Sequence, residues 1–363
     1  MKALVYHGPG ERSWDTVADP AILEPTDAVV RVDTATICGT DLHILKGDVP
    51  ETPAGTVLGH EAVGTVQEVG EAVTTVAPGD RVLVSCISAC GRCRYCKEAH
   101  YGQCLGGGGW ILGHTIDGVQ AEFARTPFAD TSLYKLPEAL GDEQVLFLAD
   151  ILPTAFEVGV LNGAVVPGDV VAIVGAGPIG LAAVLTAGLL SPSEIVVIDL
   201  DDGRLARARE FGATTTLNNG VEDVRARIME LTDGLGADVA LEAVGIPQTF
   251  ELAAELIRAG GHIANIGVHG HSACLHLETL WSRNVTITTG LVDTSTIPQL
   301  MKLVAQGRLD PAAMATHRFA LADTMAAYDV FADAAVSGAL KVVLDGSPVV
   351  EKATTADALL VRS

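Results

Sequence analysis

Four cysteines fall within a short stretch of the chain, at Cys90, Cys93, Cys96 and Cys104. Thiolates at this spacing can surround one Zn²⁺ tetrahedrally and leave no coordination position open, which is typical of structural zinc sites. Disulfides are a poor alternative in a chain without an export signal, because the cytoplasm is reducing. An iron–sulfur cluster is the stronger alternative, but no proline follows Cys104 and the spacing differs from that of bacterial ferredoxins. The cluster therefore predicts a structural zinc site.

Two segments nearer the N-terminus also carry side chains that bind metals. Residues 38–43 read Cys-Gly-Thr-Asp-Leu-His, and residues 59–64 read Gly-His-Glu-Ala-Val-Gly. Thiolate and imidazole are preferred ligands of Zn²⁺, so these segments are candidates for a second metal site. The two cysteines left over, Cys86 and Cys274, are expected to be small buried hydrophobic residues.

A glycine-rich turn lies in the middle of the chain. Gly175, Gly177 and Gly180 form a GxGxxG run that follows an apolar strand and opens a helix. Gly175 allows the tight turn, Gly177 lets the backbone approach a pyrophosphate at the helix N-terminus, and Gly180 lets helix and strand pack closely. The turn therefore predicts a dinucleotide site. Its expected contacts also include Pro178, Ile179 and Val268.

The residue that selects the cofactor is Asp199, which ends the next predicted strand 19 positions after Gly180. A carboxylate there can accept hydrogen bonds from both ribose hydroxyls of adenosine, and it repels the additional 2′-phosphate of NADP. No arginine directly follows Asp199, so NAD is the expected cofactor. Arg204, in the following helix, is expected to reach the ribose or a neighbouring phosphate.

Two regions of different character must position these side chains. Residues 1–153 are rich in Val, Gly, Pro and Thr and contain short alternating runs, which predict a β-rich, barrel-like domain. Residues 154–294 alternate strand and helix patterns, which predicts a doubly wound α/β sheet. Residues 295–363 are expected to complete the first domain. Strands are expected at 28–33, 81–85, 170–174, 195–199, 214–217, 238–244, 262–267 and 341–344, and helices at 178–190, 203–211, 221–231, 249–258 and 297–306.

The composition argues against several classes of partner. The chain has 363 residues, of which 48% are hydrophobic and 19% charged, which is ample for two folded cores. The net charge of −22 argues against nucleic acid and anionic membranes, because binding either needs a basic face. The most apolar stretch, 170–190, is broken by glycines, and the N-terminal apolar run is too short for a signal peptide. We therefore expect no membrane span and a cytoplasmic location.

These features together resemble the zinc-containing medium-chain alcohol dehydrogenases, over residues 1–345. The resemblance implies a GroES-like catalytic domain followed by a Rossmann domain, with one catalytic zinc ion, one structural zinc ion and NAD. It also implies a homo-oligomer, either a dimer or a tetramer. The most specific element matches the family's zinc signature at every defined position: Gly59-His60-Glu61-x2-Gly64-x5-Gly70-x2-Val73.

The resemblance also assigns the ligands of the catalytic zinc. Cys38 and His60 are the first two, and Asp150 takes a position that is a cysteine in many members but an aspartate in the bacterial secondary-alcohol branch. Two negative ligands and a neutral imidazole balance the charge of Zn²⁺ and leave a fourth position open for water or substrate. Glu61 is expected to coordinate transiently during ligand exchange, and Asp41 to orient the imidazole of His60.

A path for the substrate's proton follows from the same resemblance. Zinc lowers the pKa of the alcohol, and the proton is expected to leave through the Thr40 hydroxyl and the nicotinamide ribose to His43. Several relatives carry a basic residue for the pyrophosphate where this chain has Gly39. Lys341 is expected to serve instead.

The expected substrate is a small secondary alcohol, which the enzyme oxidises to a ketone. Trp110 follows a run of glycines, and in the secondary-alcohol branch a tryptophan similarly placed lines the substrate pocket. A polyol or aldehyde-adduct dehydrogenase is an alternative, because it shares the zinc and Rossmann apparatus. A non-catalytic NAD-binding sensor is a second alternative, but it predicts a damaged set of zinc ligands, whereas every position here is filled.

Overall fold

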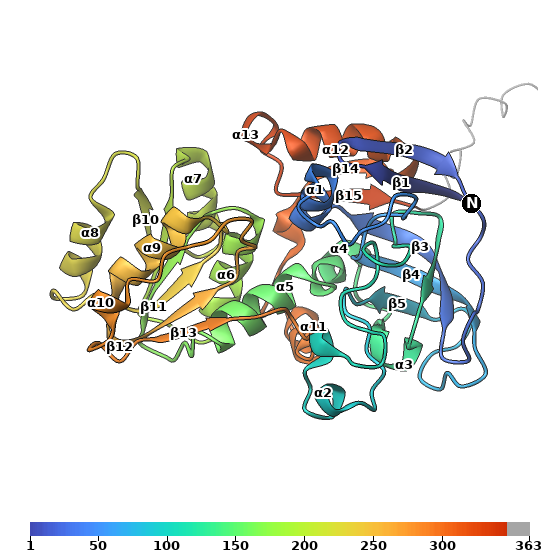
Figure 1. The fold of residues 1–363 in the computed structure, drawn as a ribbon, viewed down its shortest axis with the longest axis horizontal. Helices are drawn as coiled ribbons and strands as arrows, with labels where there is room; N and C mark the ends of the chain where they lie inside the picture. Colours follow the sequence, from blue (N-terminus) through green and yellow to red (C-terminus); the bar gives the residue numbers. More distant parts are fainter. Residues whose placement is uncertain (347–363) are drawn as a thin grey trace, which may run out of the picture.

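The computed structural model describes residues 1–346, and two β-sheets organise them (Figure 1). One is a parallel sheet of six strands in the order β10-β9-β8-β11-β12-β13. Its strands are β8 (Val170–Val174), β9 (Glu194–Asp199), β10 (Thr215–Asn218), β11 (Ala237–Glu242), β12 (Ile257–Asn265) and β13 (Thr286–Thr289). The helices between these strands are α6 (Pro178–Gly188), α7 (Asp202–Glu210), α8 (Val224–Leu231), α9 (Pro247–Leu256) and α10 (Leu277–Leu280).

Burial explains why this part of the chain forms parallel strands with helical connections. Nearly every residue of β8 and β9 is buried, as expected for strands that are covered on both faces. The predicted alternation of strands and helices is confirmed. The helix predicted at 249–258 ends earlier than expected, because β12 begins at Ile257. The sequence did not predict β13, which is short, reads Thr-Ile-Thr-Thr and is mostly exposed at the sheet edge.

The other large sheet has seven strands and builds the β-rich part of the molecule. Its order is β14-β15-β3-β4-β5-β7, and β6 pairs with β3 beside that path. A separate two-stranded sheet joins β1 to β2. The strands are β1 (Lys2–Gly8), β2 (Glu11–Thr16), β3 (Ala28–Thr36), β4 (Ala62–Val69), β5 (Arg81–Val84), β6 (Phe123–Thr126), β7 (Leu133–Lys135), β14 (Ala315–Ala320) and β15 (Lys341–Asp345).

The C-terminal segment returns to the β-rich part, so strands from residues 28–36 and 341–345 share a sheet. β15 pairs antiparallel with β3 and parallel with β14. Helix α12 (Thr324–Ala332) lies close to β1 and β2 in Figure 1, where the red end of the chain meets the blue one. These pairings place β14 and β15 in the β-rich sheet, and the assignment of residues 295–363 to the first domain stays a prediction. The predicted range 295–363 extends beyond the described residues from 347 onward.

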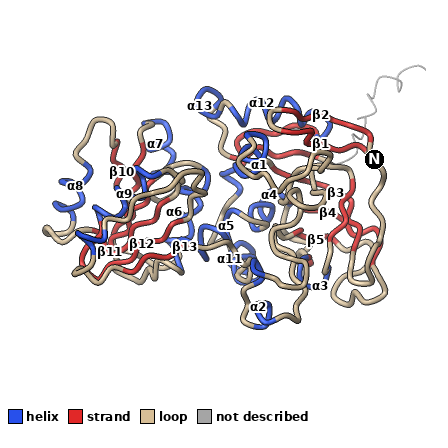
Figure 2. The backbone as a smooth tube through the Cα atoms, viewed as in Figure 1, coloured by secondary structure: helices blue, strands red, loops and turns tan. Residues whose placement is uncertain are grey.

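Helices lie between the two sheets, where the chain crosses from one to the other (Figure 2). Helix α5 (Ile151–Thr154) and the π-helical turn Ala155–Leu161 lead into the parallel sheet, and α11 (Ile297–Ala305) follows the return. The largest buried cluster includes Leu83 of β5 and Ile173 of β8, so one apolar core spans the crossing. The remaining helices are α1 (Gly39–Lys46), α2 (Arg94–Lys97), α3 (Ala129–Ser132), α4 (Asp142–Val145) and α13 (Ala334–Ser337), with short turns at Tyr101–Gln103, Leu146–Leu148, Ala312–Met314 and Leu321–Asp323.

Within residues 1–346, no single helix has both the length and the apolar character needed to cross a membrane. One bent pair of short helices, Asp142–Leu148 and Ile151–Leu161, passes that test only when the two are taken together.

Candidate active site

Three elements bring the predicted catalytic zinc ligands together. Cys38 caps the N-terminus of α1, His60 lies two residues before β4, and Asp150 precedes α5. Oδ2 of Asp150 lies 3.4 Å from Nε2 of His60 and 3.6 Å from Sγ of Cys38. Ligand atoms bound tetrahedrally to one Zn²⁺ lie about 3.4–3.8 Å apart, given normal Zn–N and Zn–S bond lengths. The donor set therefore fits zinc in both chemistry and spacing.

The charge states of these ligands also suit a cation. Burial opposes ionisation of Asp150, but the hydrogen bond and positive charge of His60 outweigh it and lower the pKa of the carboxyl. Burial likewise acts to lower the pKa of His60, and the hydrogen bonds to Asp150 and Cys38 raise it well above its usual value. The acidic ligands stabilise positive charge on the imidazole, and a metal ion would replace that charge and release the proton.

The far oxygen of Asp150 is held by two neighbours. The Thr154 hydroxyl donates to Oδ1 of Asp150 at 2.7 Å, and Sγ of Cys86 lies 3.5 Å from the same oxygen. Oδ2 is thereby left facing Cys38 and His60. Cys86 is buried as expected, but it contacts Asp150, a predicted zinc ligand, which its isolated position in the sequence did not indicate. The prediction for Cys274 was wrong, because this side chain is exposed.

Glu61 and Lys341 form a buried ion pair next to the ligands. Nζ of Lys341 donates to Oε1 of Glu61 at 2.7 Å and to the Ile37 carbonyl at 3.1 Å. The two side chains are 0% and 1% exposed. Burial alone would lower the pKa of Lys341, but the charge of Glu61 raises it, so the ammonium form is favoured. The sequence analysis treated the two residues separately and missed the pair, whose members are 280 positions apart.

A cavity of about 480 Å³ opens above the catalytic ligands and extends to the glycine-rich turn of the parallel sheet. It brings most of the predicted site residues onto one surface, from both parts of the molecule. Such a concave, largely apolar space with a few converging polar groups is typical of enzyme active sites. The predicted residues that line it are Cys38, Gly39, Thr40, His43, His60, Trp110, Asp150, Pro178, Ile179, Arg204, Val268 and Lys341.

Trp110 lies over the catalytic ligands on one wall of this cavity. Its ring meets the ring of His60 edge-on, with centroids 6.3 Å apart, and stacks on the ring of His114 at 4.1 Å. The backbone carbonyl of Trp110 is also 3.0 Å from Nδ1 of His114. Two contacts therefore fix the indole beside the place where a substrate must bind.

Thr40 and His43 lie on α1, with Thr40 nearer the ligands. Oγ1 of Thr40 is 3.6 Å from Sγ of Cys38. His43 is partly exposed, and its Nδ1 lies 2.9 Å from Oδ2 of Asp48. The sequence analysis did not include Asp48. The position of Asp48, five residues after His43, could have indicated that its carboxylate contacts the imidazole.

The glycine-rich turn has the backbone geometry that a dinucleotide needs. Gly175 adopts a φ of 109°, and a Cβ on Gly180 would lie 1.9 Å from the Gly175 carbonyl, so neither position accepts a side chain. Gly177 caps α6, and a Cβ there would meet no described atom within 4 Å. Oδ2 of Asp199 accepts a hydrogen bond from the Ala176 amide at 2.7 Å, which ties the acidic residue to the turn.

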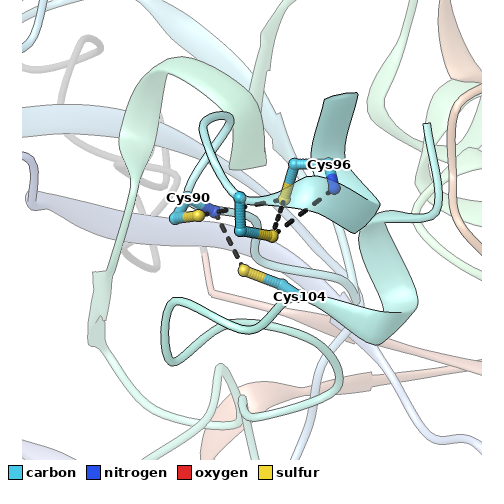
Figure 3. Close-up of side chains that lie close together, drawn as sticks. Cys90, Cys96 and Cys104 are labelled. Atoms are coloured by element: carbon cyan, nitrogen blue, oxygen red, sulfur yellow. Dashed lines mark hydrogen bonds between the residues drawn. The ribbon is translucent and has the colours of Figure 1, made fainter. Parts of the chain in front are cut away.

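The four clustered cysteines form a lobe around α2. Figure 3 shows the side chains of Cys90, Cys96 and Cys104 close together at this lobe. Sγ of Cys96 lies 3.4 Å from Sγ of Cys93 and 3.9 Å from Sγ of Cys90. All four sulfur atoms lie within 4.8 Å of one another, which fits a tetrahedral Cys₄ zinc site.

Backbone amides of this lobe donate hydrogen bonds to the cysteine sulfur atoms. The Cys96 and Leu105 amides donate to Sγ of Cys93 at 3.5 and 3.4 Å, and these bonds lower the pKa of Cys93 to about 6. The amides of Cys90 and Gly106 donate to Sγ of Cys104, both at 3.3 Å. Donors aimed at sulfur stabilise the negative form that binds a metal.

Comparison with known proteins identifies the family. Residues 24–138 match the alcohol dehydrogenase GroES-like domain, and residues 178–306 match the zinc-binding dehydrogenase family. An alcohol dehydrogenase of Cupriavidus necator is 37% identical over 95% of this chain and 98% of its own length. The chain belongs to the zinc-dependent medium-chain alcohol dehydrogenase family. It is thus an NAD(P)-dependent oxidoreductase with one structural and one catalytic zinc site.

Solved structures give the same result. Zinc-dependent alcohol dehydrogenase 2 from Streptococcus pneumonia, in its apo form, is 49% identical with a TM-score of 0.92, covering 96% of this chain and 99% of that one. The alcohol dehydrogenase TADH from Thermus sp. ATN1 is 38% identical with a TM-score of 0.88, over 95% and 99% of the two chains. A zinc-binding dehydrogenase from Sinorhizobium meliloti, 29% identical with a TM-score of 0.84, was solved with NADP; it covers 95% of this chain and 98% of that one.

Proposed function

We propose that this enzyme oxidises small secondary alcohols to ketones with NAD as the hydride acceptor, and also catalyses the reverse reduction. The observation that carries the proposal is the single cavity that joins Cys38, His60 and Asp150 to the glycine-rich turn. A hydride can pass directly from substrate to nicotinamide only when both are held in one such space.

The chain's own residues supply ligands, orientation and a proton path. Bound zinc supplies the Lewis acidity that lowers the pKa of an alcohol, and NAD supplies the hydride acceptor. Thr40, on the cavity wall, accepts the proton of the substrate hydroxyl and passes its own toward His43. His43 is hydrogen-bonded to Asp48 and partly exposed, so it can release the proton to solvent.

The preference for NAD over NADP is part of the proposal. Oδ1 of Asp199 accepts hydrogen bonds from the amides of Leu200 and Asp201 at 2.8 and 3.0 Å, which fixes the carboxylate at the end of β9. A fixed negative charge there accepts ribose hydroxyls and repels a 2′-phosphate. Pro178, Ile179, Arg204 and Val268 line the adjoining cavity, and we assign them to the cofactor. Lys341, whose ammonium pairs with Glu61, is also assigned to the pyrophosphate.

The shape of the substrate pocket favours a secondary alcohol. Trp110 is fixed against His60 and His114 and narrows the space above the ligands. Cys86, whose Sγ contacts Oδ1 of Asp150, adds only a small side chain to the lining. One narrow and one wider apolar region around the reacting carbon would accept one methyl-sized arm and one longer arm.

We further propose a cytoplasmic homo-oligomer, either a dimer or a tetramer. None of the seven cysteines forms a disulfide, as expected in a reducing compartment. β13 is an edge strand with a partly exposed Ile287, and Trp281 nearby is 78% exposed. Unpaired strand edges beside exposed aromatic surface are typical of contacts between subunits. In each subunit we place the catalytic domain at 1–153 with 295–363, and the Rossmann domain at 154–294.

A panel of alcohols assayed with NAD and with NADP tests the proposal. We expect kcat/KM for 2-propanol and 2-butanol to equal or exceed the values for ethanol and 1-butanol, with ratios up to about two-hundredfold. We also expect NAD to be preferred, as measured by the absorbance of the reduced cofactor. A strong preference for primary alcohols would contradict the proposed substrate, and a preference for NADP would contradict the proposed cofactor. If none of the alcohols is turned over, the proposed activity is wrong.

A further inference from the structure

A chain of buried hydrogen bonds runs from helix α12 to the catalytic ligands. The Tyr328 hydroxyl donates to Oε1 of Gln120 at 2.8 Å, and Nε2 of Gln120 donates to Oδ2 of Asp41 at 3.0 Å. All three side chains are 0% exposed. Tyr328 and Gln120 are 208 positions apart, and neither was singled out by the sequence analysis.

Asp41 contacts two of the three catalytic ligands. Its Oδ2 accepts a hydrogen bond from the Cys38 amide at 2.9 Å, and its Oδ1 lies 3.6 Å from Nδ1 of His60. That last distance is longer than a hydrogen bond, yet both atoms are buried and have no other partner among the described residues. A proton on Nδ1 that points to Asp41 leaves Nε2 free for a metal. Nε2 is the atom that faces Asp150.

The orientation of the Gln120 amide decides whether Asp41 meets a donor or an acceptor. Its NH₂ group donates to Asp41 and also to the Thr36 carbonyl at 3.2 Å. A reversed amide would turn its oxygen toward both of these acceptors. Burial and the charge of Asp41 raise the pKa of Tyr328 well above its usual value, so the hydroxyl keeps its proton and donates. Asp41 and the Thr36 carbonyl can only accept, so they hold the NH₂ group of Gln120 toward them, and Oε1 is left to accept from Tyr328.

We propose that Gln120 and Tyr328 are positioning residues for the catalytic metal, because they hold the Asp41 carboxylate against Cys38 and His60. Neither side chain lines the cavity in which substrate and cofactor are proposed to bind. Arg12 packs against the Tyr328 ring, with its guanidinium 5.1 Å from the centre of the ring. Two zinc ligands are therefore tied, through the three buried side chains of Asp41, Gln120 and Tyr328, to the C-terminal segment of the chain.

Two variants of the full-length, zinc-loaded enzyme test this inference. Tyr328→Phe removes one hydroxyl, and Gln120→Met keeps the length of the side chain but removes its hydrogen bonds. Zinc release into a chromogenic chelator is measured over time, together with thermal unfolding. We expect the catalytic zinc to leave about tenfold faster in both variants, the lower end of the effect of removing a direct partner of a metal ligand, because Gln120 and Tyr328 act through Asp41. Release of the structural zinc should not change.

Tyr134→Phe is the matched control, because the hydroxyl of this largely buried tyrosine donates to the Thr294 carbonyl at 3.5 Å, outside the network. Its zinc release should equal that of the wild type. Unchanged release of the catalytic zinc in the folded variants, or equal acceleration at both zinc sites, would overturn the proposal. If one variant does not fold, the other decides.

The inference rests on the catalytic zinc site of the proposed function, but its measurement does not depend on turnover. A wild-type enzyme that retains both zinc ions and oxidises no alcohol in the panel would refute the proposed function alone. A difference in zinc release between variant and wild type would still be measurable in that case.

Discussion

The two zinc sites of this enzyme are built in opposite ways. The structural site takes four identical ligands from residues 90–104, and backbone amides of the same lobe satisfy its sulfur atoms. The catalytic site groups Cys38, His60, Glu61 and Asp150, of which we propose Cys38, His60 and Asp150 as the zinc ligands, and side chains from distant segments support them. Local ligands make a closed site that needs little support from the rest of the fold. An open site for chemistry depends on the whole domain.

The largest expected effect is that of Asp150→Ala on turnover. The variant loses one of the three proposed ligands, the carboxylate that lies 3.4 Å from Nε2 of His60 and 3.6 Å from Sγ of Cys38. We expect kcat/KM to fall by well over a hundredfold, a larger loss than for an outer partner of a ligand. Elemental analysis should find the structural zinc retained and the catalytic zinc depleted. Full activity in this variant would mean that the third ligand is misassigned.

Cys104→Ser should affect stability and leave the chemistry intact. Loss of one thiolate opens the closed site, and structural zinc contributes directly to folding. We expect one zinc ion per chain in place of two, and a Tm lower by several degrees or more. The fraction that stays folded should keep its KM for alcohol. A wild type with a single zinc ion, or with iron and acid-labile sulfide, would contradict the underlying assignment.

The ion pair between Glu61 and Lys341 shows how much support the catalytic site needs. Lys341→Met leaves a buried carboxylate without its cation, which costs about 3–5 kcal/mol of unfolding free energy. Burial already raises the pKa of Glu61, and loss of the ammonium raises it further, so the folded variant binds a proton that the unfolded chain releases. The variant is therefore relatively more stable at low pH and loses stability as the pH rises.

Thermal unfolding at pH 5.5 and pH 8 measures this effect. The deficit relative to the wild type should be larger at pH 8. The double variant Glu61→Gln/Lys341→Met should recover most of the lost stability, because no unpaired charge remains. If the loss of stability in Lys341→Met does not depend on pH, its cause is lost packing around Lys341 and not the unpaired charge of Glu61.

The contrast between the sites also explains what the sequence could predict. The Cys₄ lobe and the turn at Gly175 are local patterns, so spacing alone identifies them. Cys38 and His60 could be assigned only through a family motif, because they lie in separate segments of the chain. The pair of Glu61 with Lys341, and the contact of Cys86 with Asp150, depend on how β15 and β5 pack in the tertiary fold. No local pattern records such contacts. β13 was also not predicted, because an exposed edge strand does not show the apolar pattern of a buried strand.

The smallest expected effect is that of Thr154→Val, which removes the 2.7 Å hydrogen bond to Asp150 and keeps the shape of the side chain. Oδ1 of Asp150 would retain only the weak donor Cys86 at 3.5 Å, so the carboxylate could rotate and Oδ2 would spend less time facing Cys38 and His60. We expect the catalytic zinc to leave about tenfold faster, near the lower limit for an outer partner, and the structural zinc to leave at its normal rate. Thr186→Val is the matched control, because that buried hydroxyl donates to the Ala182 carbonyl within α6, remote from both zinc sites. If Thr154→Val accelerated zinc release at both sites, the effect would not be specific to the catalytic site. The claim that only the catalytic site depends on distant side chains would then be wrong.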